Sequence, residues 1–173
     1  MFEITIAPLA LQNIEDEIFK RGRDIIADGG EVGGFLWSQK GVDWWSGLNI
    51  QIAGDAGPNA EHGFRMINFD MPYFHEMNAV LSVDHGMECV GSWHTHKVGD
   101  GIPSDADYEH VLSLLDYRDR IFARTRRALL LIMLRTDTHH WTPVPWVFHK
   151  NQLERPGNPV GCARVDPAYV KGE

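Results

Sequence analysis

The stretch Gly91-Ser92-Trp93-His94-Thr95-His96, residues 91–96, ends a short apolar segment that spans residues 87–93. A short apolar run of this kind is typical of a central, buried strand. Side chains alternate along a strand, so His94 and His96 share one face and Thr95 lies on the other. Two imidazoles that point the same way at the end of a strand can bind one metal ion.

A second group of polar residues, Pro103-Ser104-x-x-Asp107, opens a predicted helix over residues 104–115. A hydrolytic zinc site uses three protein ligands and keeps a fourth position for water, and Asp107 can fold back onto the strand end as the third ligand. A structural interpretation competes with this one. Ser104 is a good N-cap, and Asp107 is the acidic residue of a turn that resembles a capping box. For this pair alone the cap is favoured, and the two roles compete for the Asp107 carboxylate.

Alternation and helical spacing predict further elements on both sides of this segment. The expected strands are residues 2–6, 32–37, 42–53, 64–69, 128–134 and 141–148. The expected helices run from Pro8 to the Gly29-Gly30 pair and over residues 71–83, and residues 55–63 and 97–103 are expected loops. Pro143 and Pro145 predict that the last strand pairs with residues 128–134 or lies at an edge. This irregular mixture predicts a single-domain α/β sandwich around a mixed β-sheet.

The domain is expected to span residues 1–150, followed by a proline-containing C-terminal tail, 151–173, that is extended or partly ordered. The 173 residues are 43% hydrophobic and 23% charged, as in ordinary globular domains. No apolar run approaches the ~18 residues of a membrane span, and the first residues do not resemble a signal peptide. Two cysteines make no disulfide framework, so we expect a cytoplasmic protein.

The formal net charge is −8 and is unevenly distributed. Residues 1–116 contain 6 Lys and Arg against 19 Asp and Glu, whereas residues 117–173 contain 10 against 5. The acidic larger part argues against a nucleic-acid partner and suits a basic protein or peptide. The basic patch from Arg118 to Arg127 is either a solvated face or a docking surface.

Glu31 lies just before Gly33 and Gly34, two residues that permit close approach of another backbone. Together with His94-x-His96 and Ser104-x-x-Asp107, it resembles the signature of the JAMM (MPN+) zinc metallopeptidases, the JAB-domain family that includes deubiquitinases. In that family a Glu with following glycines precedes His-x-His, seven residues, Ser, two residues and Asp. Ser104 is the eighth residue after His96 and Asp107 the eleventh, as that pattern requires.

Two further stretches bear on this resemblance. Residues 56–60 are similar to a Gly-Pro loop of bacterial JAMM proteins, and Trp93 before the first histidine is also similar to those proteins. Lys97 departs from the family, which commonly has proline after the second histidine.

The resemblance implies a cytidine-deaminase-like JAMM/MPN fold and one Zn²⁺ per chain. It implies that His94, His96 and Asp107 bind the metal, that Glu31 moves protons to and from the reacting groups, and that Ser104 donates a hydrogen bond to the oxyanion. No thiol nucleophile is needed in such a mechanism, so Cys89 and Cys162 have no catalytic task. Cys89 is expected in the core.

The stand-alone bacterial members imply an isopeptidase or peptidase that cleaves after the C-terminal glycine of a ubiquitin-like protein. Its partners would be that protein or its conjugates and homologues of activating and conjugating enzymes, in a bacterial conjugation or antiphage system. An alternative is a peptidase that processes sulfur-carrier proteins. A non-catalytic MPN scaffold ranks lower because such relatives usually lose the ligands, and a DNA-associated relative is disfavoured by the acidic charge.

Other residues rank lower as functional candidates. A second zinc site built from His139, His140, His149 and Cys162 matches no standard spacing, so surface and turn positions are favoured. Three of the tryptophans are expected in strand packing, with a substrate groove as the alternative: Trp37, Trp44 and Trp45.

Overall fold

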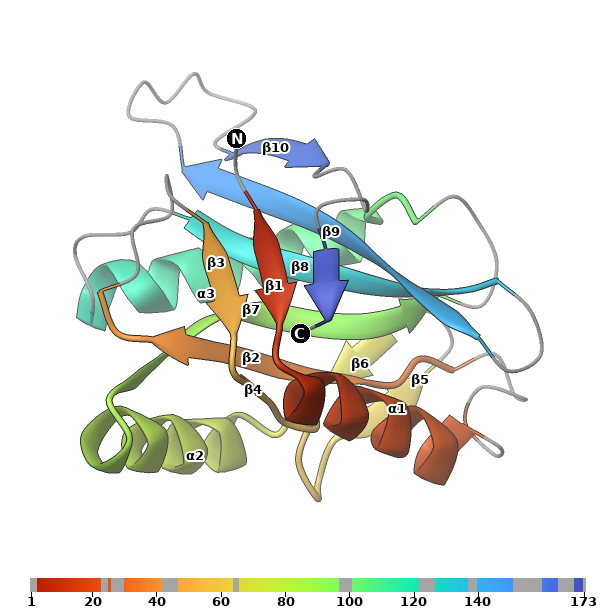
Figure 1. Ribbon diagram of the computed structural model, residues 1–173, viewed down its shortest axis with the longest axis horizontal. Helices are drawn as coiled ribbons and strands as arrows, with labels where there is room; N and C mark the ends of the chain where they lie inside the picture. The colour runs from red at the N-terminus through yellow and green to blue at the C-terminus, as the bar shows by residue number, and fades with distance from the viewer. Residues whose placement is uncertain are drawn as a thin grey trace.

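The computed structural model describes residues 3–22, 25, 30–41, 47–63, 66–96, 101–121, 127–136, 140–150, 160–164 and 170–172. Its helices are α1 (Pro8–Gly22), α2 (Met71–Asp84) and α3 (Asp105–Ile121). Its strands are β1 (Ile4–Ile6), β2 (Gly33–Gln39), β3 (Leu48–Ile50), β4 (Ile52–Ala53), β5 (Glu61–Gly63), β6 (Met66–Asn68), β7 (Met87–His96), β8 (Arg127–Arg135), β9 (Trp141–Lys150), β10 (Val160–Arg164) and β11 (Val170–Gly172). Figure 1 shows their arrangement.

The largest sheet of the described residues has six strands in the order β10-β9-β8-β7-β2-β4. β7 and β8 are parallel and are joined through α3, as parallel neighbours require a crossover connection. The other neighbours in this sheet are antiparallel, so the sheet is mixed. A smaller sheet, β11-β1-β3, and the hairpin β5-β6 complete the described strands. The α/β class and the mixed sheet predicted from the sequence are confirmed.

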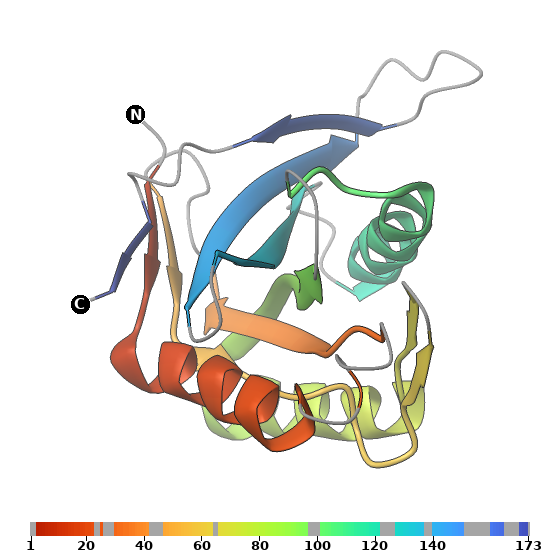
Figure 2. The same ribbon diagram turned by 90° about the vertical axis from the view of Figure 1, so that its right-hand side faces the viewer.

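The large sheet is covered on both faces. β1, β3 and β11 lie on one side of it and α3 lies on the other (Figure 2). Alternation along β8 explains this arrangement: Leu129 and Leu131 pack in a core cluster with residues of α1, β1 and β3, whereas Leu130 and Ile132 pack against α3. A third cluster joins α2 to β2 and β7. β7 is buried along most of its length between these layers, as expected for the apolar segment at residues 87–93.

Several expected boundaries were wrong, among them the end of the helix expected over residues 104–115, which extends to Ile121 as α3. The first helix ends at Gly22 rather than at the glycine pair 29–30, because glycine is a poor helix former. Of the strand expected over residues 42–53, residues 42–46 lie outside the described residues, and residues 48–53 form two strands: β3 pairs with β1, and after Gln51 the chain crosses to the large sheet, where β4 pairs with β2. Residues 61–63, expected in a loop, pair with β6 as the strand β5.

The strand β9 pairs with β8 along its length and with β10 over Trp146–Lys150. Pro143 and Pro145 therefore lie beyond the part of β9 that β10 covers, which agrees with the rule that proline avoids positions with two neighbouring strands. Two segments of the C-terminal tail form strands: β10 joins the large sheet and β11 pairs in parallel with β1. In the described part of the chain, no helix is both long and apolar enough to cross a membrane.

Candidate metal centre

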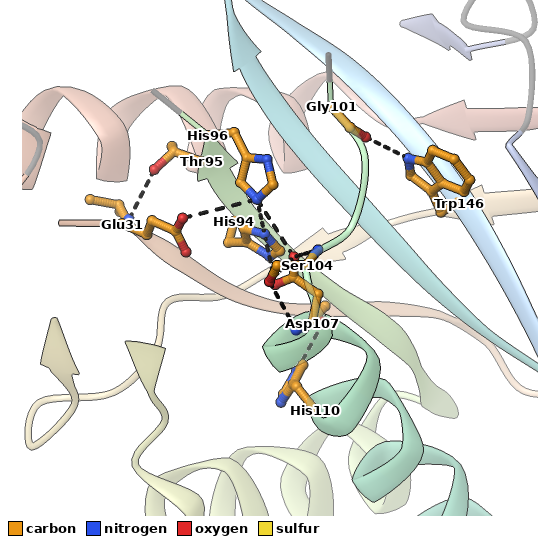
Figure 3. Close-up of polar contacts among 11 residues, drawn as sticks. Glu31, His94, Thr95, His96, Gly101, Ser104, Asp107, His110 and Trp146 are labelled. Atoms are coloured by element: carbon orange, nitrogen blue, oxygen red, sulfur yellow. Dashed lines mark hydrogen bonds and ion pairs between the residues drawn. The ribbon is translucent and has the colours of Figure 1, made fainter. Parts of the chain in front are cut away.

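His94 and His96 lie at the end of β7, on the face of the sheet that α3 covers (Figure 3). Their Nε2 atoms are 3.0 Å apart, and the His94 side chain is almost fully buried at 3% exposure. Trp93, on the opposite face, packs in the core cluster with α1 and donates its Nε1–H to the carbonyl of Gly54. The predicted alternation is therefore confirmed, and both imidazoles point toward one location.

Glu31 reaches the histidines because β2 runs antiparallel to β7 with Gly33 opposite His94. The pairing continues past the end of β2: the Thr95 N–H donates to the Val32 carbonyl at 2.8 Å, and the Val32 N–H donates to Thr95 Oγ1 at 3.0 Å. One step further in this register, Glu31 comes opposite His96. Its Oε1 lies 3.9 Å from His96 Nε2 (Figure 3).

The two glycines after Glu31 are required by close backbone approach, as the sequence predicted. A Cβ at Gly33 would lie 2.4 Å from the carbonyl oxygen of Trp93, and one at Gly34 would lie 1.8 Å from the carbonyl oxygen of Gly54. Larger residues would push β2 away from its neighbours. The glycines thus keep Glu31 within reach of the β7 histidines.

Asp107, in the first turn of α3, completes the group of polar side chains. Its Oδ1 is 3.2 Å from His94 Nε2, and its Oδ2 is 3.6 Å from His96 Nε2. The same Oδ2 accepts hydrogen bonds from the backbone N–H of Ser104 at 2.7 Å and from its hydroxyl at 2.8 Å. The carboxylate therefore contacts the helix start and both histidines at once: Oδ2 faces Ser104 and His96, and Oδ1 faces His94. The competition between cap and metal for Asp107 stays a prediction.

Ser104 is held in place by its own helix start. Its carbonyl accepts from the Tyr108 N–H, and its hydroxyl accepts from the Asp107 N–H at 3.3 Å, as an N-cap does. The chain just before it is anchored where Trp146 Nε1–H donates to the Gly101 carbonyl at 2.7 Å. Because the Ser104 hydroxyl donates to Asp107, it must change partner before it can donate to a substrate oxygen.

A metal ion can be held by this group of side chains. One ligand atom from each of Glu31, His94 and His96 lies within 4.8 Å of the others. Imidazole nitrogens and carboxylate oxygens together suit zinc and several other divalent transition metals. Two carboxylates, Glu31 and Asp107, thus stand beside one pair of histidines, and either can supply the third protein ligand.

The charge states also favour a cation. Burial lowers the pKa of His94 to about 4, although the Asp107 carboxylate acts in the opposite direction. Burial would raise the pKa of Asp107, but the hydrogen bond from His96, the charge on His94 and the hydrogen bonds from Ser104 hold that pKa well below its usual range. At neutral pH the site therefore presents a neutral imidazole and an ionised carboxylate, the forms that bind metals.

One residue of this site was missed from the sequence. His110 lines the same pocket as Glu31, His94 and Asp107. Its Nε2 is 3.0 Å from the hydroxyl of Ser92, its ring stacks on Phe69 with centroids 4.6 Å apart, and burial lowers its pKa to about 4. The available signal was its position three residues after Asp107, on the same face of α3.

The other residues singled out in the sequence are accounted for as follows. Trp37 is buried and its Nε1–H donates to Asn78, which confirms a packing role, and Cys89 is buried as expected. His140 and His149 belong to no metal-ligand group among the residues that the structure describes. Several candidates lie outside the described residues or side chains, namely Trp44, Trp45, Lys97, Arg118, Arg120, Arg124, Arg126, His139 and Cys162.

Fold and site thus define an α/β protein with a candidate metal centre at the end of a central strand. No family model and no curated protein matches the chain. Among solved structures, the chain is similar to the solution structure of protein DSY2949 from Desulfitobacterium hafniense, with a TM-score of 0.59 and 15% sequence identity over 98% of this chain and 94% of that one. At this identity the similarity shows the fold alone.

Proposed function

We propose that this protein is a zinc-dependent peptidase or isopeptidase that cleaves after the C-terminal glycine of a ubiquitin-like protein. The observation that supports it is the convergence of His94, His96 and Asp107 with a further carboxylate, Glu31, 3.9 Å from His96. A scaffold has no need of a second carboxylate at a metal site. The spacing of these residues along the chain, which resembles the JAMM signature, supports the choice of reaction and substrate.

In the proposed site His94, His96 and Asp107 would hold the zinc ion. When bound, zinc lowers the pKa of a coordinated water to about 7 and polarises a carbonyl group. Glu31 Oε1 accepts the proton of the attacking water and then transfers it to the departing amine, because both steps of peptide hydrolysis need a proton transfer. The Ser104 hydroxyl turns from Asp107 Oδ2 to the oxyanion, an interaction worth about 3 kcal/mol at comparable sites.

The experiment that tests this proposal compares Glu31→Gln with Glu15→Gln, a matched change at an exposed position on α1. Each protein is loaded with zinc and incubated with ubiquitin-like and sulfur-carrier proteins that are extended past their terminal glycine. Single-turnover cleavage, zinc content and substrate affinity are measured side by side. We expect Glu31→Gln to slow cleavage by about 100-fold or more while zinc content and substrate affinity stay near those of the parent, and Glu15→Gln to match the parent in all three.

Two outcomes would contradict the proposal. A zinc-loaded parent that binds these proteins and cleaves none of them would indicate a scaffold. A Glu31→Gln protein that cleaves at the parental rate with zinc bound would exclude the proposed role of Glu31 in proton transfer. Cleavage restricted to sulfur-carrier proteins would keep the mechanism and change the substrate.

A further inference from the structure

His62 links the backbone of Glu31 to helix α1. It lies on β5, in the hairpin that flanks the start of β2, and is half-buried. Its Nδ1 is 2.8 Å from the backbone carbonyl oxygen of Glu31, and its Nε2 is 3.3 Å from Nη1 of Arg21. These contacts place one imidazole between a cation of α1 and the main chain of the residue proposed to move protons.

The contact with Arg21 determines where the His62 ring carries its proton. A guanidinium group only donates hydrogen bonds, so His62 Nε2 must accept. A neutral imidazole has one donor and one acceptor nitrogen, so the proton is on Nδ1. The Nδ1–H therefore donates to the Glu31 carbonyl.

Arg21 is itself held by acidic side chains. It forms an ion pair with Glu17 one turn earlier on α1, and its Nη2 lies 4.0 Å from Asp55. The Arg21 side chain is only 24% exposed, which limits its alternative conformations. The cation is thus fixed at the end of α1 and can orient His62.

We propose that His62 is a positioning residue for Glu31. The Glu31 carbonyl and the Val32 N–H belong to one peptide unit, and this N–H donates to Thr95 Oγ1 at 3.0 Å. His62 donates to the carbonyl of the same unit, so both polar atoms of the peptide that follows Glu31 are held and the carboxylate is directed toward His96. This inference rests on the proposed function, in which Glu31 transfers the proton, and a displacement of about 1 Å at such a group can cost about 100-fold in rate.

Two substitutions of His62 distinguish the contributions of its two ring nitrogens. In His62→Asn the side-chain amide nitrogen takes the place of Nδ1 and can still donate to the Glu31 carbonyl. In His62→Gln the amide reaches the place of Nε2 and the Nδ1 donor is lost. We expect His62→Gln to lower the single-turnover cleavage rate by 10-fold or more, with zinc content and substrate affinity retained, and His62→Asn to recover most of that loss. The same two changes at His85, an exposed residue at the C-cap of α2, serve as matched controls.

A double substitution tests whether His62 acts through Glu31. In a Glu31→Gln background, His62→Gln should cause no further loss of rate, because residues that act as a unit are not additive. Equal rates for His62→Gln and His62→Asn would overturn the proposal. A full additional loss in the Glu31→Gln background would also overturn it, since it would show a role independent of Glu31.

A measurement without turnover distinguishes failure of this inference from failure of the proposed function. Long-range ¹H–¹⁵N correlation spectra of the zinc-loaded parent report which nitrogen of His62 carries the proton. We expect the Nδ1–H form, and a shift toward the Nε2–H form in Arg21→Met. A parental His62 protonated on Nε2 overturns the inference even if the enzyme is active, whereas the Nδ1–H form in a protein that cleaves nothing contradicts only the proposed function.

Discussion

Ser104 and Asp107 hydrogen-bond to each other in both directions at the start of α3: the Ser104 N–H and hydroxyl donate to Asp107 Oδ2, and the Asp107 N–H lies 3.3 Å from the Ser104 hydroxyl. This exchange orients the carboxylate so that Oδ1 faces His94. The same pair of residues therefore caps α3 and forms part of the candidate metal centre. Substitution of Ser104 or Asp107 can separate these two roles.

Substitution of Ser104 distinguishes helix capping from catalysis. Ser104→Ala removes the cap and should lower the free energy of unfolding by about 1 kcal/mol, whereas Ser104→Gly should cost only a few tenths. Both variants lack the hydroxyl proposed to donate to the oxyanion, so both should lose about 100-fold or more in cleavage rate. Denaturant unfolding and single-turnover assays measure the two effects. A Ser104→Gly protein with parental activity would exclude the proposed role in catalysis.

The choice between the two carboxylates as the third metal ligand is tested by Asp107→Asn and Glu31→Gln. We expect Asp107→Asn and His96→Ala to lower zinc affinity by more than the 10- to 100-fold that is typical of outer-shell changes. Glu31→Gln should change it little. Competition with a chelator gives the affinities, and His140→Ala at an exposed position is the control. The reverse order for the two carboxylates would assign the metal to Glu31, His94 and His96.

The metal-free protein should lose stability as the pH falls from about 6.5 to 4. The pKa of both His94 and His110 is about 4 in the folded protein, below the ordinary value of 6.5, so between these values the unfolded chain binds more protons. Stability therefore rises with pH across this window and is fully present above it. Asp107, whose pKa is also lowered, extends the loss to lower pH.

Denaturant unfolding in the presence of a chelator at several pH values measures this dependence. His110→Gln should show a shallower decline, because one of the two buried imidazoles is then absent. A free energy of unfolding that stays constant from pH 7 to pH 4.5 in the parent would contradict the neutral, buried state of these histidines.

The cysteines should have no part in the chemistry. Cys89 is buried in β7 at 2% exposure, and its Sγ lies 3.5 Å from the carbonyl oxygen of Gly91, within the strand. A Cys89→Ala, Cys162→Ala double variant that folds should keep its cleavage rate within about threefold, since hydrolysis by a metal-activated water needs no thiol. Loss of activity with folding and zinc content intact would argue against the proposed mechanism.

The part of the site that could be predicted from the sequence is the part encoded in local spacing. Alternation along one strand places His94 and His96 on the same face, and the start of the next helix supplies Ser104 and Asp107. His62 and its contacts could not be found in this way, because Arg21 lies 41 residues away and Glu31 31 residues away along the chain. Such contacts depend on how helices, hairpin and sheet come together.

The same reason explains the wrong boundaries. The run over residues 48–53 has the alternation of one strand, but its two halves pair with different neighbours, β1 and β2. Residues 61–63 carry little apolar character and form β5 only because β6 pairs with them. These strands form because they pair with segments that are distant in the chain, and local propensity carries no information about such pairing.

The end of β7 and the start of α3, which lie close together along the chain, supply His94 and His96 and then Ser104 and Asp107. Glu31 comes from a different part of the chain, at the entrance to β2. The residues proposed to retain the metal thus lie within one short stretch of the chain, and the residue proposed to move protons lies in a separate one. A single substitution at position 31 would then remove the proposed hydrolysis and leave the proposed metal ligands in place.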